Sequence, residues 1–436
     1  MRVKGFKVEN VPFGFGAIQT HLLSDLTAIL SALDEFKVVP APPPGGRSVY
    51  EIFARAIPDT TLIDRSDTSE GQKIRSALSK RGFCARLCGP TKSGKSVLLH
   101  QILGARDPIY LSGGLIRNLQ LFLSYLAVKL EGTQNLALDE PATMERVFAS
   151  KRPIVIDEFH RVNAPTRRAI VKLIQAFLDE EVNIILVSWT DIEGKKIEAD
   201  PGLSYRSEAV DMRHWNPSDL EPIGQRGFVK GLNTEVDPQL LKALAHQSFG
   251  SPFLMQQYCC KVAETTNVST SRSARAKIEI SEQILTQMFV GSCAQTRKNF
   301  LGWIERAGDQ QVKLKTGSTT SIYGLMLLAV SRMEPIHRMG MSSLARKMRD
   351  RVDGPADFLT PTAVEAHVKA FMQRLGKNPH QHTSVDYYEG KLHIHPFFKR
   401  YLLWDFAPSK GYSYPDLTRY QDEPSDLPPA TGASSP

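Results

Sequence analysis

The segment GPTKSGKS, residues 89–96, constrains the fold of this chain more than any other feature of its sequence. It lies between the apolar run FCARLC, which favours a strand, and the run VLLHQIL, which favours a helix. Gly89, Gly94, Lys95 and Ser96 satisfy the pattern G-x-x-x-x-G-K-[ST], in which small residues let backbone N–H groups surround phosphate oxygens at the amino terminus of a helix. The segment therefore predicts a phosphate-binding loop (P-loop) inside an α/β domain.

Two side chains of this loop have predicted roles in addition to its shape. Lys95 is expected to contact the β- and γ-phosphates of a nucleotide, and Ser96 is expected to give a hydroxyl ligand to Mg²⁺. The predicted cofactors are accordingly ATP and Mg²⁺. The loop residues predicted to contact the nucleotide are Gly89, Pro90, Thr91, Lys92, Ser93, Gly94, Lys95, Ser96 and Val97.

A second segment, PIVIDEFH, places Asp157 and Glu158 directly after an apolar run, at the predicted carboxyl end of a strand. Ligands of open parallel sheets bind at this end of the strands. Asp157 is expected to hold Mg²⁺ through water, and Glu158 is expected to orient and deprotonate the water that attacks the γ-phosphate. Together with the loop, the two acids predict hydrolysis as well as binding.

The run VNIILVSWT predicts the next strand and offers two candidates for a residue that senses the γ-phosphate, Ser188 and Thr190. The sequence does not choose between them, and either hydroxyl can equally satisfy local backbone groups. Arg206, in GLSYRSEAVDM, precedes a further predicted strand, a position from which a guanidinium can reach the nucleotide of a neighbouring subunit. A routine surface ion pair is the competing interpretation of Arg206.

The periodicity of apolar residues predicts a multidomain chain. Residues 46–215 are expected to form a three-layer α/β core of parallel strands joined by helices, and residues 216–295 a helical lid. Residues 318–407 predict three helices and a hairpin turning at Glu389 and Gly390, which is the order of a winged helix. The other predicted parts are an amino-terminal helical segment with a Pro/Gly linker (1–45), a linker (296–317) and a disordered tail (408–436).

The composition argues against secreted and membrane-spanning classes. The chain of 436 residues has a formal net charge of +8 and five cysteines that lack the spacing of a zinc site or a disulfide framework. It contains no leader-like amino terminus and no stretch of about 18 apolar residues, so we expect a cytoplasmic protein without membrane contact. The HQH and HIH segments at 380–382 and 393–395 have no cluster of Cys or carboxylate residues to complete a metal site, so we expect none there. The predicted metal ligands are Ser96 and Asp157 of the loop and the acidic segment.

These segments together resemble the AAA+ superfamily of P-loop ATPases, with the STAND-type and origin-licensing-like branches nearest. In STAND proteins a Gly-x-Pro turn of the lid lies close to the adenine, which implies this role for Gly250 and Pro252 in FGSPFLMQQYC. In AAA+ relatives an arginine before the fifth strand acts on a neighbouring subunit, which implies the same for Arg206. The ending HIHPFFKRYLLW is similar to the winged-helix domain that follows many bacterial STAND cores. No clear lid arginine of the kind that many relatives use as a second sensor accompanies the turn.

The resemblance implies an ATP-driven molecular switch in bacterial signalling or antiviral defence, whose nucleotide state controls conformation or oligomerisation. The implied partners are further copies of the chain, through the ATPase domain, and a protein effector or regulator, with DNA possible through the winged helix. Two alternatives stay open: a DNA-associated ATPase of transposition or replication loading, and a nucleotide-retaining scaffold with little turnover. DEFH also fits the DExH box of helicases, but no array of later helicase motifs follows it.

Overall fold

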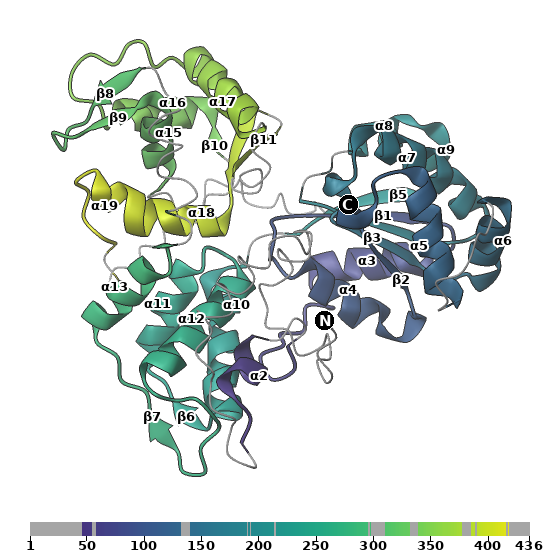
Figure 1. Cartoon of the computed structure of the whole chain (residues 1–436), viewed down its shortest axis with the longest axis horizontal. Coiled ribbons are helices and arrows are strands. Elements are labelled where there is room, and N and C mark those ends of the chain that lie inside the picture. The colour runs from purple at the N-terminus through teal and green to yellow at the C-terminus, as the bar shows by residue number, and fades with distance from the viewer. Residues whose placement is uncertain are drawn as a thin grey trace, which may run out of the picture. The chain divides into compact units, whose positions relative to one another are not determined.

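The computed structural model describes residues 46–54, 58–131, 140–189, 191, 193–212, 215–294, 297, 310–331, 339–376, 385–388, 390–415 and 417. These residues form two compact units, one from residues 46–235 and 251–277 and the other from residues 236–250 and 278–417. Both units are drawn in Figure 1, and each is described by itself below. The predicted amino-terminal segment, residues 1–45, lies outside the described residues.

A parallel sheet forms the centre of the first unit. Its strands are β1 (Cys84–Cys88), β2 (Ile109–Ser112), β3 (Ile154–Asp157), β4 (Ile184–Val187) and β5 (Ser207–Asp211). They lie in the order β2-β3-β4-β1-β5, and every pairing is parallel. The carboxyl ends of the five strands therefore meet at one edge of the sheet, and β1, which leads into the P-loop, lies between β4 and β5.

Helices connect these strands over both faces of the sheet (Figure 1). They are α3 (Ser69–Ser79), α4 (Lys95–Leu103), η3 (Gly104–Arg106), η4 (Gly113–Leu115), α5 (Leu119–Glu131), α6 (Glu140–Ser150), η5 (Phe159–Arg161), α7 (Ala164–Asp179), α8 (Gly194–Ala199) and α9 (Pro201–Ser204). Ile154 and Ile156 of β3 belong to a core shared with α5, α6 and α7, whereas Val155 belongs to a core shared with α3 and α4. Burial on both faces explains the continuous apolar sequences of the central strands. The predicted three-layer α/β core is confirmed.

The first unit also contains helices from the predicted lid. Its elements beside the sheet are α2 (Val49–Phe53), α10 (Pro217–Gln225), the π-helical turn η6 (Arg226–Gly231), α12 (Pro252–Thr265) and the paired short strands β6 (Thr234–Glu235) and β7 (Ala276–Lys277). Helix α12 packs against α10 and α2, and the ring centroids of Phe53 and Phe228 lie 5.2 Å apart. The range 216–295 predicted as one lid therefore divides between the two units, because α11 and α13 belong to the second.

The second unit combines helices with an antiparallel sheet. Its helices are α11 (Pro238–Gln247), α13 (Glu282–Gly291), α15 (Ile322–Ser331), α16 (Met341–Arg349), α17 (Pro361–Gly376), α18 (Pro396–Tyr401), the π-helical turn η7 (Leu402–Phe406) and α19 (Ala407–Ser409). Its strands are β8 (Gln311–Lys313), β9 (Thr319–Ser321), β10 (Met339–Gly340), β11 (Val385–Tyr388) and β12 (Lys391–Ile394). Helices α15 and α17 both pack on α16, and β11 and β12 form the predicted hairpin, to which β10 adds a third strand.

One tryptophan connects the last helical segment of this unit to two others. Trp404 in η7 donates from Nε1 to Oε1 of Gln247 in α11 at 2.8 Å, and its ring stacks on Phe289 of α13 with centroids 4.7 Å apart. The helices and the hairpin of residues 318–407 follow the order that the sequence predicts. Among the residues that the structure describes, no helix is both long and apolar enough to cross a membrane.

The range 296–317 differs from the linker that the sequence predicts. Its last part contains β8, which pairs with β9 in an antiparallel hairpin. Val312 and Leu314 are buried and alternate with polar residues, which is the pattern of a strand with one face in the core. The run is too short for its period to be recognised in the sequence.

The predicted disordered tail, residues 408–436, begins with folded chain. The Lys410 C=O accepts a hydrogen bond from Thr316 Oγ1 at 2.8 Å, and the ring of Tyr414 stacks on Trp404 with centroids 6.0 Å apart. These contacts extend the fold past Pro408, because the aromatic rings of this otherwise polar segment, Tyr412 and Tyr414, both pack on the second unit.

Candidate functional site

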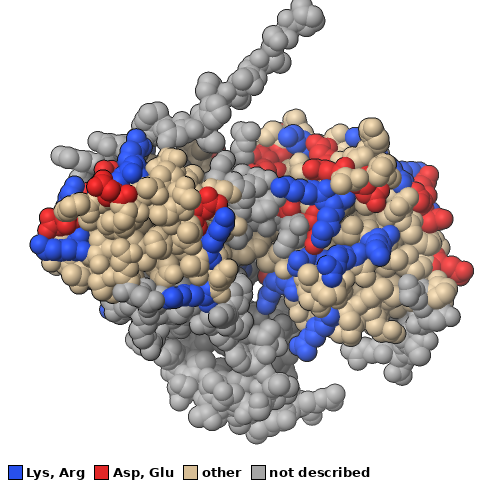
Figure 2. All heavy atoms as spheres, turned by 90° about the horizontal axis from the view of Figure 1, so that it is seen from above, with Lys and Arg blue, Asp and Glu red and all other residues tan. Residues whose placement is uncertain are grey.

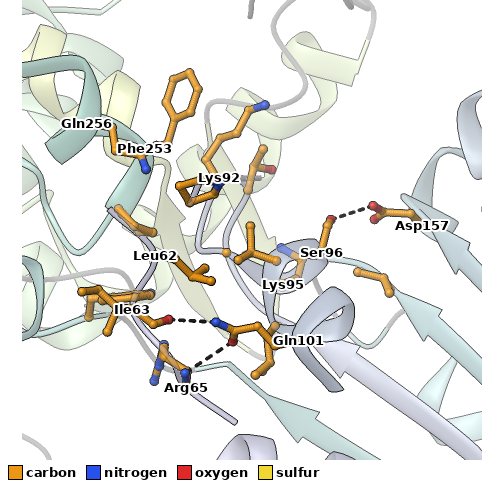
Figure 3. A pocket seen from close by; sticks show the side chains of 18 of the residues that line it. Leu62, Ile63, Arg65, Lys92, Lys95, Ser96, Gln101, Asp157, Phe253 and Gln256 are labelled. Atoms are coloured by element: carbon orange, nitrogen blue, oxygen red, sulfur yellow. Dashed lines mark hydrogen bonds between the residues drawn. The ribbon is translucent and has the colours of Figure 1, made fainter. Parts of the chain in front are cut away.

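The P-loop connects β1 to α4 at the carboxyl edge of the sheet, and Figure 3 shows its surroundings. Its backbone needs glycine at two positions, because Gly89 has φ +146° and Gly94 has φ +91°. A Cβ atom at Gly89 would also lie 2.9 Å from the C=O oxygen of Met212, which is too close for a side chain. Gly94 directly precedes α4, whose first N–H groups have no partner within the helix and are therefore available to an anion.

Lys95, the first residue of α4, reaches back over the loop. Its Nζ donates to the C=O oxygens of Gly89 at 2.8 Å and of Pro90 at 2.7 Å. Burial lowers the pKa of Lys95 to about 8, although the nearby Asp157 carboxylate opposes this change. Phosphate oxygens can replace the two carbonyls as stronger, charge-assisted acceptors.

Ser96 and Asp157, the two predicted ligands of Mg²⁺, lie next to each other. The Ser96 Oγ donates to Asp157 Oδ2 at 2.8 Å, along the dashed line in Figure 3. Both offer the oxygen ligands that Mg²⁺ prefers, and two protein ligands leave positions for waters and phosphates. No group of three or more His, Cys, Asp or Glu side chains that could hold a metal occurs in the described part of the chain. The pair therefore fits a magnesium ion held jointly with a nucleotide, and not a closed metal site.

Glu158 borders the same cavity, but its carboxylate has a partner in this structure. Its Oε2 accepts from an Arg161 guanidinium nitrogen at 3.0 Å, and both side chains are about half exposed. An exposed ion pair of this kind contributes less than about 1 kcal/mol. The carboxylate can therefore leave Arg161 at small cost when a water has to be oriented.

Of the two predicted sensor residues, the structure places one. Ser188 follows β4 and lines the cavity, with its Oγ 3.6 Å from Cys88 Sγ. Thr190 lies outside the described residues. Sequence analysis missed two neighbours, His160 and Trp189, which also line the cavity with ring centroids 5.3 Å apart. Burial lowers the pKa of His160 to about 4, so its imidazole is neutral near pH 7.

The cavity has a volume of about 290 Å³ and extends beyond the phosphate loop. Its other walls come mostly from segments that the sequence analysis did not identify: Pro58, Thr61, Leu62, Ile63, Arg65, Leu98, Gln101, Val187, Trp215, Ile223, Phe253 and Gln256. Most of these side chains are apolar. A concave apolar surface with a few polar groups is the usual form of a small-molecule pocket.

Hydrogen bonds connect these walls to one another and to the loop. The Gln101 Nε2 donates to the Ile63 C=O at 3.1 Å, and its Oε1 accepts from the Arg65 N–H at 3.4 Å (Figure 3). The Arg65 guanidinium lies 4.7 Å from the centroid of the Trp215 ring. The Trp215 Nε1 donates to the Ser93 C=O at 2.9 Å. Trp215 therefore joins the apolar walls to the P-loop.

The predicted lid turn brings one of its two residues to the cavity. Pro252, the first residue of α12, lines it, and a Cβ at Gly94 would lie 3.8 Å from Pro252 Cγ. Gly250 has φ +70°, which favours glycine, but it belongs to the second unit and is not one of the lining residues.

Arg206 lies at the opposite edge of the sheet from the P-loop. Its C=O accepts from the Cys84 N–H at the start of β1 at 2.8 Å. Its guanidinium forms an ion pair with Asp179 at the end of α7, with a nitrogen–oxygen distance of 2.7 Å. The structure therefore does not bring Arg206 to the cavity of its own chain, and the ion pair of the competing interpretation is present.

No protein-family model and no curated protein matches this chain. Solved structures match it in fold. A Walker-type ATPase of Pyrococcus abyssi superposes with a TM-score of 0.50 at 12% identity, over 79% of this chain and 99% of that one. Cdc6p of Pyrobaculum aerophilum gives a TM-score of 0.42 at 11% identity, over 83% and 99%. The Holliday junction branch migration motor RuvB of Thermotoga maritima gives 0.38 at 15%, over 77% and 95%.

These similarities concern the fold alone, because the identities are low. The match to the Walker-type ATPase extends over almost the whole of that chain. Together with the five-stranded parallel sheet and the loop between β1 and α4, it shows that this chain has the three-layer fold of a P-loop ATPase.

Proposed function

We propose that the chain binds ATP with Mg²⁺ in this cavity and hydrolyses it. The observation that supports the proposal most is the convergence of Lys95, Ser96 and Asp157 at one end of a cavity whose other end is mostly apolar. A cation, a hydroxyl and a carboxylate suit a phosphate chain with its metal, and apolar walls suit a base. The cavity thus offers complementary surfaces to both parts of one nucleotide.

The side chains of the site divide the proposed chemistry among them. Lys95 and the first N–H groups of α4 hold phosphate oxygens, and the bound polyanion restores the pKa of Lys95 from about 8 toward its usual range. Ser96 and Asp157 would hold Mg²⁺, which would supply positive charge to stabilise the phosphate chain. Glu158 leaves Arg161, orients a water and accepts its proton. Ser188 and Thr190 both remain candidates for contacting the γ-phosphate.

The proposed output is a change of conformation or of self-association. Helices α10 and α12 contribute Ile223 and Phe253 to the cavity, so nucleotide binding and release act directly on them. Arg206 cannot reach the cavity of its own chain, so we propose that it exchanges Asp179 for the nucleotide of a second copy. The winged-helix interpretation of residues 318–407, the protein effector and the role in bacterial signalling or defence rest on the sequence resemblance.

Calorimetric titration with ATP and Mg²⁺ tests the site. Lys95→Met removes the charge and keeps most of the volume, so we expect the affinity for ATP to fall about 100-fold. Lys172→Met, at an exposed position of α7, is the matched control and should bind ATP like the wild type. Normal binding by Lys95→Met would place the nucleotide elsewhere and overturn the assignment.

A second experiment distinguishes the proposed partners. It measures ATP turnover with and without duplex DNA at two salt concentrations, and it records particle mass in the same samples. Stimulation by DNA that weakens with salt, together with growth in mass, would favour a DNA-associated ATPase. Turnover indifferent to DNA, with mass changing only on ATP, supports the switch and a protein partner. ATP retained without turnover would favour the scaffold.

Acidic side chains lie among the basic ones on the face shown in Figure 2, so the charge of this face does not select DNA.

A further inference from the structure

A lysine occupies a glycine-like backbone conformation in the P-loop. Lys92 has φ +65°, a value that a residue with a side chain adopts uncommonly and at an energetic cost that surrounding contacts must offset. Glycine would adopt the same conformation without strain. The contacts of Lys92 therefore indicate what the strained backbone holds in place.

Two of these contacts join Lys92 to the first turn of α12. The Ser251 Oγ accepts from the Leu254 N–H at 3.3 Å, which caps α12, and it also donates to the Lys92 C=O at 3.4 Å. The Lys92 Nζ lies 5.0 Å from the centroid of the Phe253 ring, within the range of a cation–π contact. Figure 3 shows the two side chains extending side by side, one from the loop and the other from α12.

The Lys92–Phe253 contact forms part of the cavity wall. Both residues line the cavity, and they come from two of its walls, the phosphate loop and α12. Lys92 lines the cavity and is also exposed to solvent. A polyanion that enters the cavity adds a short-range attraction for this ammonium.

We propose that Lys92 is a latch that retains the nucleotide. Its ammonium contacts the bound nucleotide while it stays on the Phe253 ring, so that the loop and the first turn of α12 close together over the ligand. Because this contact forms on bound nucleotide, it slows release more than association. The latch rests on the proposed function and adds to it a residue that positions α12. The lid sequence offers no clear sensing arginine, so Lys92 would be the cation that contacts both the nucleotide and α12.

Stopped-flow release of a fluorescent ATP analogue, chased with excess unlabelled ATP, tests the latch. Lys92→Met keeps the aliphatic stem and loses the charge, whereas Phe253→Leu stays apolar and loses the ring. We expect each substitution to speed release about fivefold, with association nearly unchanged. Lys92→Arg keeps the cation and should release the analogue at nearly the wild-type rate.

Two further variants separate the latch from a purely structural role. The Lys92→Met/Phe253→Leu double variant should release the analogue no faster than the faster single variant, because all three lack the same contact. Lys92→Gly relieves the backbone strain, so it should unfold at or above the wild-type temperature and yet release the analogue about fivefold faster. A purely structural residue would change both properties in the same direction.

Each outcome of this experiment has a distinct meaning. Wild-type release rates in Lys92→Met and Phe253→Leu, in a protein that binds ATP, would overturn the latch and leave the proposed function intact. Additive acceleration in the double variant would also overturn it, because the two residues would then act independently. A wild-type chain that binds no ATP contradicts the proposed function itself.

Discussion

The two ends of the candidate nucleotide cavity are built in different ways. The phosphate end comes from two short segments, residues 89–97 and 157–158, whose polar side chains and carbonyls are hydrogen-bonded to one another. The base end comes from segments far apart in the chain, residues 58–65, 215–223 and 252–256, and most of its side chains are apolar. The first end depends on local backbone geometry, and the second depends on tertiary packing.

We therefore expect the phosphate end to serve hydrolysis and the base end to serve recognition of the base. All nucleoside triphosphates carry the same phosphate chain, so the phosphate end cannot distinguish one base from another. Substitutions there should abolish the binding or the turnover of any nucleotide. The base end adds contact area and shape, so substitutions there should lower affinity by smaller factors and change the preference among nucleotides. Substitutions at each end and between the two ends can test this division.

Glu158→Gln should give the largest effect, because it removes the proton acceptor from the phosphate end. The amide keeps the size of the side chain, so ATP turnover should fall by about 10² to 10⁴-fold. The affinity for ATP should be nearly unchanged, because Glu158 is proposed to act on the attacking water and not on the phosphates. Phosphate release and equilibrium titration on the same samples measure both quantities.

Glu181→Gln is the matched control for this substitution. Glu181 is an exposed carboxylate after α7 that accepts from Arg81 at 3.0 Å, so its amide variant should hydrolyse ATP like the wild type. Loss of ATP binding in Glu158→Gln would make this residue part of the loop's structure. Wild-type turnover in Glu158→Gln would remove it from the chemistry.

The lowered pKa of Lys95, at the same end, predicts a pH dependence of ATP binding of intermediate size. Burial lowers this pKa from 10.5 to about 8, so the free protein loses the ammonium as pH rises above 8, and ATP binding has to restore it by taking up a proton. The affinity for ATP should therefore fall about tenfold for each pH unit above 8. Phosphate groups have a second pKa of about 6 and no longer titrate in this range. Equilibrium titration with ATP across this range measures the slope.

The stability of the free protein should change in the opposite direction. Between pH 8 and 10.5 the folded chain binds fewer protons at Lys95 than the unfolded chain, so the contribution of this residue to the free energy of unfolding rises with pH. Lys95→Arg stays charged throughout and should show neither dependence. Equal slopes in Lys95→Arg and the wild type would assign the proton to another group.

The same division explains which parts of the site the sequence predicts. The phosphate end is encoded in contiguous residues, because the two glycines supply the positive φ values and Lys95 and Ser96 follow at fixed spacing on the first turn of α4. The three-layer core is predictable for a related reason, since strands buried on both faces have continuous apolar sequences. In both cases the residues that determine the structure are close together in the sequence, so a local pattern is enough to predict it.

Apart from Pro252, the base end was not predicted, because its other residues are ordinary in the sequence. Arg65 and Trp215 belong to segments without a motif, and only the fold brings the guanidinium to 4.7 Å from the ring. The buried Arg86 of β1 is a second example, because its partners Asp191 and Glu198 are 105 and 112 residues away in the chain. No local pattern encodes such contacts.

Trp215→Phe should give the smallest effect, because Trp215 joins the two ends through one hydrogen bond. Phenylalanine keeps an aromatic ring beneath Arg65 and removes the N–H that donates to the Ser93 C=O at 2.9 Å. One such bond contributes about 1 kcal/mol, so the affinity for ATP should fall about fivefold. Calorimetric titration with ATP and with inorganic triphosphate measures how the loss divides between the two ends.

Comparing ATP with inorganic triphosphate shows which end of the cavity Trp215→Phe affects. If Trp215 supports the loop, Trp215→Phe weakens ATP and inorganic triphosphate by the same factor, because both occupy the phosphate end. Trp215→Ala also removes the ring, so it should weaken ATP further while triphosphate changes no more than in Trp215→Phe. A loss confined to ATP in Trp215→Phe would mean that the loop keeps its shape without the indole. A loss in Trp215→Phe as large as that of Lys95→Met would mean that the two ends form a single cooperative unit.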